Sequence, residues 1–270
     1  FNRPLPHSFK VQLPHTWNID SANQNYYGWA WYQKEISIPS NWRNKNTVLE
    51  FGAINHSSIV FVNGDKVSEQ IGDGFNKISI NLNEKLAYGK RNLITVAVNN
   101  DYGKNKVPYG SSFDWPNDGG IIRPAKLIIS NKPSAVYLHV KPTINLSNNE
   151  GMLNIQLGFA RKEKLQLHVV VTEENQPTKN VILNRTVMPA WQGNVATSNF
   201  VIPNIHPWHF DFPNLYRIDV SVLKEGKPVD KISTCIGFRE LNFRNDQTFL
   251  NGERIKLMGV EWTAGSNPNY

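Results

Sequence analysis

The feature of this sequence that most limits its fold is a long succession of short strand-like segments, with no stretch of helical periodicity longer than about two turns. β-Branched and aromatic residues alternate with polar ones, and Asn, Gly and Pro fill the short gaps. This pattern is typical of antiparallel β-sandwiches and argues against alternating strands and helices. The clearest segments are residues 48–51, 59–62, 78–82, 93–98, 121–129, 152–159, 165–171, 195–202 and 216–223.

Two Asn-Gly pairs predict tight hairpins. Asn63 and Gly64 separate two strand-like segments, and both residue types adopt the positive φ that a two-residue turn requires. Asn251 and Gly252 predict a second hairpin near the end of the chain. The run that follows, residues 255–260, has no visible partner strand, so we interpret it as the first strand of a larger domain.

The chain divides into two domain-sized blocks and a tail. A turn-rich stretch at residues 130–134 follows a block of about 130 residues, the size of a jelly roll. The next block has about 105 residues and about seven strand-like segments, the size of an immunoglobulin-like sandwich. We therefore expect domains over residues 1–133 and 134–240, and a linker with the first strand of a catalytic barrel over 241–270.

The basic charge of the chain does not predict a nucleic-acid-binding protein. The net charge is +7, but Lys and Arg are scattered singly. The densest basic segment, residues 161–164, contains Glu163 and is interpreted as the tip of a hairpin. No run of about 18 apolar residues occurs, so we expect no membrane-spanning segment.

Cysteine and histidine usage argues against a metal site or a structural disulfide. The single cysteine, Cys235, lies in an apolar stretch and is expected to be buried in a core. The histidines show no spacing typical of metal ligands or of a catalytic base, and no cofactor is expected. One cysteine is compatible with every compartment; a periplasmic or secreted location is slightly favoured over a cytoplasmic one. The first residue is Phe1 rather than Met, as expected either if a leader had been removed or if the chain had been trimmed.

Several short sequence words occur together in a specific order. Each word alone is weak, but their order and spacing resemble glycoside hydrolase family 2 over essentially the whole chain, and the first block is most similar to β-glucuronidases. The resemblance implies a sugar-binding jelly roll, an immunoglobulin-like domain and the start of a TIM barrel. The words are residues 13–18, 31–36, 59–67, 97–100, 114–124, 213–216, 236–239 and 249–259.

The resemblance also implies three substrate-binding residues. In the family, the Asp that precedes the Gly-Ile-x-Arg word reaches the active site and binds a sugar hydroxyl. In this sequence that Asp is Asp114. The alternative is an Asp that caps a turn. Glu261 and Trp262 end the expected first barrel strand, where a carboxylate and an indole can bind a sugar, unless they are edge residues of the tail. Galactosidases and glucuronidases usually carry Asn-x-His there, and the Trp is more like β-mannosidase relatives.

Other prominent residues have structural interpretations. Arg123 is expected to form an ion pair that fixes its loop, and Gly119 and Gly120 are expected to serve backbone geometry. Several Trp residues fit strand periodicity, so we expect them in the core. These are Trp29, Trp31 and Trp191.

The resemblance implies a retaining β-glycosidase of β-galactosidase or β-glucuronidase type that hydrolyses O-glycosyl bonds of a carbohydrate substrate. Such enzymes use two carboxyl groups, a nucleophile and a general acid/base. Both family glutamates lie far along the barrel, so we expect no catalytic residue and no activity in this chain. The alternative is a carbohydrate-binding or adhesion module without activity. Homo-oligomerisation of the full-length protein stays open.

Overall fold

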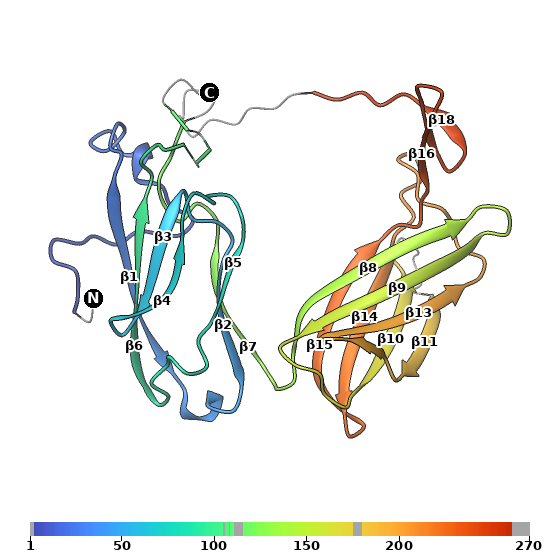
Figure 1. The fold of residues 1–270 in the computed structure, drawn as a ribbon, viewed down its shortest axis with the longest axis horizontal. Coiled ribbons are helices and arrows are strands. Elements are labelled where there is room, and N and C mark those ends of the chain that lie inside the picture. The colour runs from blue at the N-terminus through green and yellow to red at the C-terminus, as the bar shows by residue number, and fades with distance from the viewer. Residues whose placement is uncertain (1–2, 105, 108, 111–115, 175–179, 261–270) are drawn as a thin grey trace. The chain divides into compact units, whose positions relative to one another are not determined.

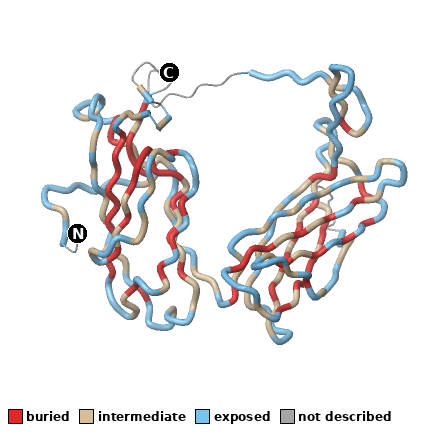
Figure 2. Tube along the Cα trace, viewed as in Figure 1, coloured by how far each residue is buried: buried red, intermediate tan, exposed pale blue. Residues whose placement is uncertain are grey.

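The computed structural model describes residues 3–104, 106, 107, 109, 110, 116–174 and 180–260. In these residues the chain is built of antiparallel strands, and the helical elements are two three-residue 3-10 helices, Trp17–Ile19 and Ser40–Trp42 (Figure 1). The predicted all-β class is confirmed. The chain forms two compact units, which divide between Ser130 and Asn131. Each unit has its own buried core between facing sheets (Figure 2).

The first unit is a sandwich of two antiparallel sheets with a jelly-roll type of core. One sheet has the order β1-β6-β3-β4 and the other the order β5-β2-β7. Alternate residues of each strand face inward, as in β2, where Thr47, Leu49 and Phe51 are buried. The strands are β1 (Trp29–Ile38), β2 (Asn46–Phe51), β3 (Ser57–Val62), β4 (Asp65–Gln70), β5 (Ile78–Asn81), β6 (Lys90–Asn99) and β7 (Ala125–Ser130).

The predicted hairpin at Asn63-Gly64 is confirmed. The pair joins β3 to β4, with φ of 54° at Asn63 and 97° at Gly64. By contrast, residues 13–18 are not part of a strand. The Thr16 hydroxyl accepts a hydrogen bond from the Asn18 amide and caps the helix Trp17–Ile19. Such a side-chain bond to a nearby amide competes with a strand ladder.

The second unit is an immunoglobulin-like sandwich. Its sheets have the orders β12-β13-β9-β8 and β11-β10-β14-β15. Leu153, Ile155 and Leu157 of β9 belong to one buried cluster with Ile218 and Val220 of β14 in the opposite sheet. The strands are β8 (Ala135–Asn145), β9 (Glu150–Phe159), β10 (Gln166–Glu173), β11 (Val181–Val187), β12 (Ala190–Gln192), β13 (Val195–Ile202), β14 (Tyr216–Lys224) and β15 (Lys227–Ile236).

Two of the expectations for this unit are wrong. Residues 161–164 are not a hairpin tip, because they connect β9 to β10, which lie in different sheets. Cys235 is exposed rather than buried. In β15 the side chains of Ile232 and Ile236 pack on the core, so Cys235 lies on the outward face of an edge strand.

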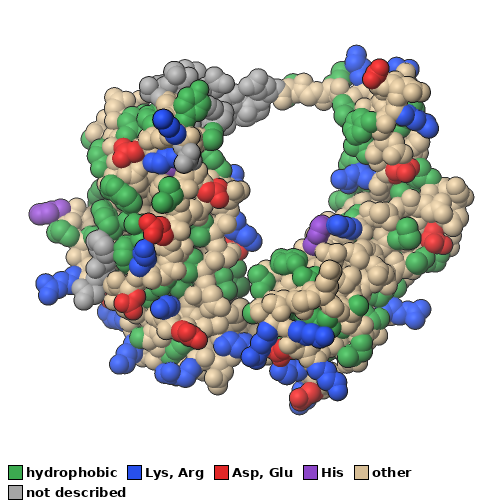
Figure 3. All heavy atoms as spheres, viewed as in Figure 1, with side chains coloured by type: hydrophobic (Ala, Val, Ile, Leu, Met, Phe, Trp, Pro, Cys, Tyr) green, Lys and Arg blue, Asp and Glu red, His purple; other side chains and the backbone are tan. Residues whose placement is uncertain are grey.

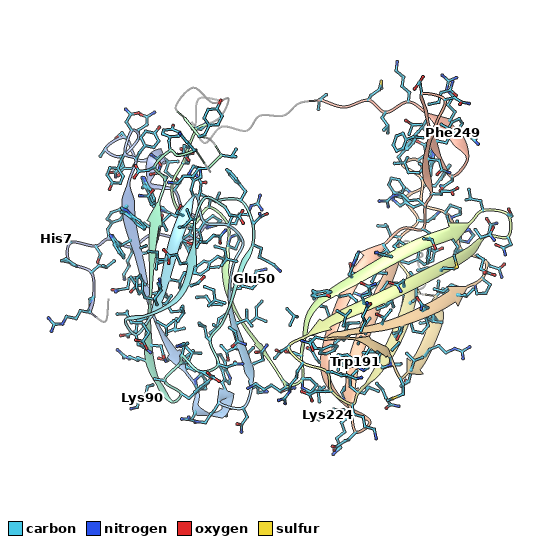
Figure 4. The ribbon with its side chains drawn as sticks, viewed as in Figure 1. His7, Glu50, Lys90, Trp191, Lys224 and Phe249 are labelled. Carbon is cyan, nitrogen blue, oxygen red and sulfur yellow. The ribbon has the colours of Figure 1, made fainter. Side chains whose placement is uncertain are left out.

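The tryptophans divide between the core and the surface. Trp191 packs against the core of the second unit, with its ring centroid 5.6 Å from that of Phe159 (Figure 4). Trp29 and Trp31 are 46% and 39% exposed, so the expectation of core positions is wrong for both. The inward positions of β1 are taken by other residues of the same strand, including Ala30 and Tyr32.

A small three-stranded sheet follows the second sandwich. It contains β16 (Leu241–Arg244), β17 (Gln247–Leu250) and β18 (Glu253–Ile255). Asn251 and Gly252 turn the chain between β17 and β18 with φ of 50° and 81°, which confirms the second predicted hairpin. Strand structure ends at Ile255, so residues 256–260 do not form the expected strand. Phe249 lies in this sheet (Figure 4), and the Cζ atom of Arg244 lies over its ring, 4.1 Å from the ring centroid.

One edge strand in each sheet of the second sandwich contains a proline. β15 is an edge strand with Pro228, and β8 is an edge strand with Pro142. The surface that Figure 3 shows carries Lys and Arg side chains scattered over both units and mixed with Asp and Glu. Among the described residues, no helix is long and apolar enough to span a membrane.

Candidate functional site at the loop end of the jelly roll

The three substrate-binding residues predicted from the sequence, Asp114, Glu261 and Trp262, lie outside the described residues. The structure does describe the chain on either side of Asp114. β6 ends at Asn99 and β7 begins at Ala125, and residues 116–123 of this long connection have a defined backbone. The candidate site is therefore built from the residues that hold this connection in place.

Two asparagines bind each other's backbone across the base of this connection. Asn100 donates from Nδ2 to the carbonyl oxygen of Asn117 at 2.9 Å, and Asn117 Nδ2 donates to the carbonyl oxygen of Asn100. The Oδ1 atom of Asn117 accepts a hydrogen bond from Asn55 Nδ2 at 3.0 Å. All three side chains are buried, so their Nδ2 donors bind protein acceptors where water does not reach; Asn55 Oδ1 has no hydrogen-bond partner among the described residues.

A fourth buried asparagine connects this group to the N-terminal segment. Asn18 Oδ1 accepts hydrogen bonds from the Gly119 amide at 2.8 Å and from Asn100 Nδ2 at 3.3 Å. Its Nδ2 donates to the carbonyl oxygens of Asn23, Gln24 and Tyr26. Residues far apart in sequence are thus fixed by one set of side chains. We call Asn18, Asn55, Asn100 and Asn117 the asparagine network.

The two glycines of the connection serve backbone geometry, as predicted. A Cβ atom on Gly119 would lie 2.0 Å from the Trp17 indole. Gly120 has a φ of 148°, and a Cβ atom there would lie 2.2 Å from the carbonyl oxygen of His15. The Gly120 carbonyl also accepts the amide of Asn55, so the connection is bound from two sides.

Arg123 does not form the predicted ion pair within the described part of the chain. Its Nη1 atom donates to the carbonyl oxygen of Phe75 at 3.4 Å, and the side chain is exposed. The guanidinium therefore binds the loop after β4 through a backbone acceptor, and no carboxylate is required.

Burial shifts the pKa of several groups around this end of the unit. Burial lowers the pKa of His56, whose Nε2 lies 2.8 Å from the carbonyl oxygen of Val107. It also lowers the pKa of His15 and raises that of Tyr32 to about 12, and the two side chains share a 2.8 Å hydrogen bond. These groups stay neutral at neutral pH.

Asp118 is a residue that the sequence analysis missed. Burial raises the pKa of its carboxyl group. The neighbouring Tyr102 has its pKa raised to about 12, mainly by burial and then by a hydrogen bond with Tyr27 and by the charge of Asp118. The only signal in the sequence is that Asp118 lies four residues after Asp114 in the same connection. The arrangement offers a carboxylate and phenol hydroxyls, which can bind a ligand rich in hydroxyl groups.

The described residues hold no cluster of three or more His, Cys, Asp or Glu side chains that could bind a metal ion. The groups gathered here are amides, hydroxyls, aromatic rings and one partly buried carboxylate. They can orient a polar ligand by hydrogen bonding.

Curated relatives of the chain are glycosidases. It is 30% identical over 267 residues to a putative β-glucuronidase of Formosa agariphila, a match that covers 93% of this chain and 30% of the relative. It is 28% identical over 263 residues to a β-galactosidase of Thermoanaerobacter pseudethanolicus, covering 95% and 34% of the two chains. The chain thus spans about a third of the length of these relatives.

Solved structures show the same fold. The Bifidobacterium dentium β-glucuronidase, solved with coumarin-3-O-glucuronide, superposes with a TM-score of 0.82 at 19% identity, over 94% of this chain and 47% of that one. A family 2 member from Bacteroides cellulosilyticus gives a TM-score of 0.79 at 21% identity, over 92% and 35%.

Two family models match the chain in succession. The model of the glycosyl hydrolases family 2 sugar-binding domain matches residues 3–128, and the model of glycosyl hydrolases family 2 matches residues 136–239. These ranges correspond to the two sandwiches and together cover most of the chain. The chain therefore belongs to glycosyl hydrolase family 2.

Proposed function

We propose that this chain is the non-catalytic N-terminal part of a retaining β-glycosidase, of β-glucuronidase or β-galactosidase type. The observation that carries the proposal is the match of two family 2 models, in chain order, to a chain that spans only about a third of its curated relatives. In such an enzyme the two catalytic carboxyl groups lie on a barrel. We propose that they follow residue 270 and that none of residues 1–270 is catalytic.

Within that enzyme, the chain contributes scaffold and substrate contacts. The proposed domains are residues 1–133, 134–240 and a tail over 241–270 that leads into the barrel. Asp114, Glu261 and Trp262 are the proposed substrate contacts. Support for Asp114 comes from the asparagine network, which fixes the chain on the C-terminal side of this residue. A rigid base lets a loop present a binding group with little loss of entropy.

The first experiment compares the 270-residue chain with the full-length protein on nitrophenyl β-glucuronide and β-galactoside. The full-length protein should hydrolyse one of them with retention, and the 270-residue chain should give no turnover above a buffer blank. Turnover by the short chain would contradict the proposal, because it would show that the catalytic groups lie within residues 1–270. A full-length protein with binding but no hydrolysis would leave a carbohydrate-binding or adhesion module as the function.

The second experiment tests Asp114 in the full-length enzyme. Asp114→Asn keeps the shape of the side chain but removes its charge. A hydrogen bond to a charged group contributes about 1.5–3 kcal/mol, so kcat/KM should fall by about one to two decades with an unchanged melting temperature. A lower melting temperature with normal kcat/KM would identify Asp114 as a turn-capping residue instead.

A further inference from the structure

A row of exposed aromatic side chains runs along the edge strand β1. Trp29 and Trp31 are 46% and 39% exposed, and Tyr27, two residues before Trp29, is 40% exposed. The residues between the two tryptophans and after them, Ala30 and Tyr32, pack into the core. The two indole rings lie 6.3 Å apart between centroids and within 25° of parallel. Large aromatic side chains that gather on a surface indicate a binding function.

The backbone under this row is held rigidly. Tyr26 donates its hydroxyl hydrogen to the carbonyl oxygen of Trp29 at 2.8 Å, and the Gly28 amide donates to Asn100 Oδ1 at 2.9 Å. Trp29 pairs with Asn99 in the continuous β1–β6 ladder. A surface that is already formed loses little conformational entropy when a ligand binds.

Polar groups continue the row at its N-terminal end. The rings of Tyr27 and Tyr102 lie 5.0 Å apart, and the charge of Asp118 acts on Tyr102. The Asp118 carboxylate has no hydrogen bond or ion pair with any part of the chain that the structure describes, although it is partly buried. Partial burial disfavours the charged form of this carboxylate, and hydrogen-bond donors from a ligand would offset that effect.

We propose that Tyr27, Trp29, Tyr102 and Asp118 form a binding site for a neutral carbohydrate chain. The apolar faces of the sugar rings pack on the aromatic rings, and sugar hydroxyls donate to the Asp118 carboxylate. The composition favours this ligand over a protein partner, because the row has aromatic rings with polar edges and no aliphatic side chain. The Asp118 carboxylate has no counter-ion among the described residues, and its negative charge disfavours an acidic ligand.

This inference does not depend on the proposed catalysis, because the 270-residue chain alone should bind. The probes are cellohexaose, xylohexaose and mannohexaose, with oligogalacturonate as the acidic comparison, measured by calorimetry and by tryptophan fluorescence. At least one neutral hexasaccharide should bind at millimolar concentration or below and change the fluorescence. Failure of all three neutral probes to bind, or binding of the acidic probe alone, would overturn the proposal.

Three variants locate the site. Trp29→Ala and Asp118→Asn should each weaken binding at least about tenfold, which corresponds to about 1.4 kcal/mol. Phe243→Ala, which removes a 70% exposed ring from β16 in the other unit, should bind like the unchanged protein. Equal affinity for all of these proteins would overturn the assignment of the site. Concentration-dependent dimerisation that Trp29→Ala abolishes, without sugar binding, would identify a contact between copies instead.

Asp118→Asn has a second readout that a purely structural carboxylate would not share. Because burial raises the pKa of Asp118, its charged form destabilises the folded state at neutral pH. The variant should therefore have a higher melting temperature at pH 7 together with weaker sugar binding. A lower melting temperature with unchanged binding would show that Asp118 holds the loop and does not contact a ligand. This variant also keeps the test valid if Trp29→Ala folds poorly.

Discussion

Replacing Asn100 by alanine should destabilise the first unit and leave the second unchanged. The Asn100 side chain is fully buried, and it joins the Gly28 amide, the Asn117 carbonyl and Asn18 in one network. Asn100→Ala removes the partners of the Gly28 amide and the Asn117 carbonyl. A buried group without a partner costs about 1–3 kcal/mol, and water can reach the half-buried Gly28, so the loss is roughly 2–4 kcal/mol.

Calorimetry measures this loss within one molecule. For a unit of this size each kcal/mol of lost stability lowers the melting temperature by roughly 3–5 °C, so the melting temperature of the first unit should fall by roughly 10 °C. The second sandwich has a separate core, and its transition is the internal reference. Asn76→Ala is the matched control, because Asn76 is exposed and its change should stay within about 0.5 kcal/mol.

A second variant separates hydrogen bonding from shape. Asn100→Asp fills the same volume and still accepts from the Gly28 amide, but it turns an oxygen toward the Asn117 carbonyl. If the network acts through its donors, Asp should be destabilising as well. A loss below about 1 kcal/mol for alanine, or full tolerance of Asp, would refute the reasoning.

Three further results should follow from burial and exposure. Leu157→Ala should lower the free energy of unfolding of the second unit by about 2–5 kcal/mol, because Leu157 is fully buried between the sheets. A shift in the melting of the first unit instead would contradict separate cores. Cys235 should react with a thiol reagent in the native protein, at a rate that denaturant does not greatly raise. The folded pKa of His56 lies below its ordinary value of 6.5, so the unfolded state binds more protons at acid pH. The contribution of neutral His56 to stability should be fully present above about pH 6.5 and be lost as the pH falls. Melting curves at several pH values should show a flatter pH dependence for His56→Gln.

Strand positions were predictable because alternation and turn residues are local signals. The two Asn-Gly hairpins and segments such as residues 152–159 and 195–202 needed no knowledge of distant contacts. Alternation does not reveal which of its two faces is inward, since that depends on the sheet that packs opposite. For this reason the prediction of core positions is wrong for Trp29 and Cys235, which lie on outward faces of edge strands.

The candidate site was less predictable because its contacts are long-range. Asn18 binds the amide of Gly119, 101 residues away. Single asparagines near turns look like ordinary turn residues in a sequence, and nothing local indicates that they meet. The partial burial of the Asp118 carboxylate depends likewise on what surrounds it after folding.

The prolines in the edge strands bear on how this protein behaves at high concentration. An exposed strand edge can add a strand from another molecule, which is a common first step of aggregation. Pro228 in β15 and Pro142 in β8 each lack the amide hydrogen that such an added strand would need. The exposed Lys227 adds a positive charge that opposes the approach of a second copy of β15. The second sandwich can therefore end in two long edge strands, which contact each other through the Ala135 amide and the Asp230 carboxylate, and still resist intermolecular sheet formation.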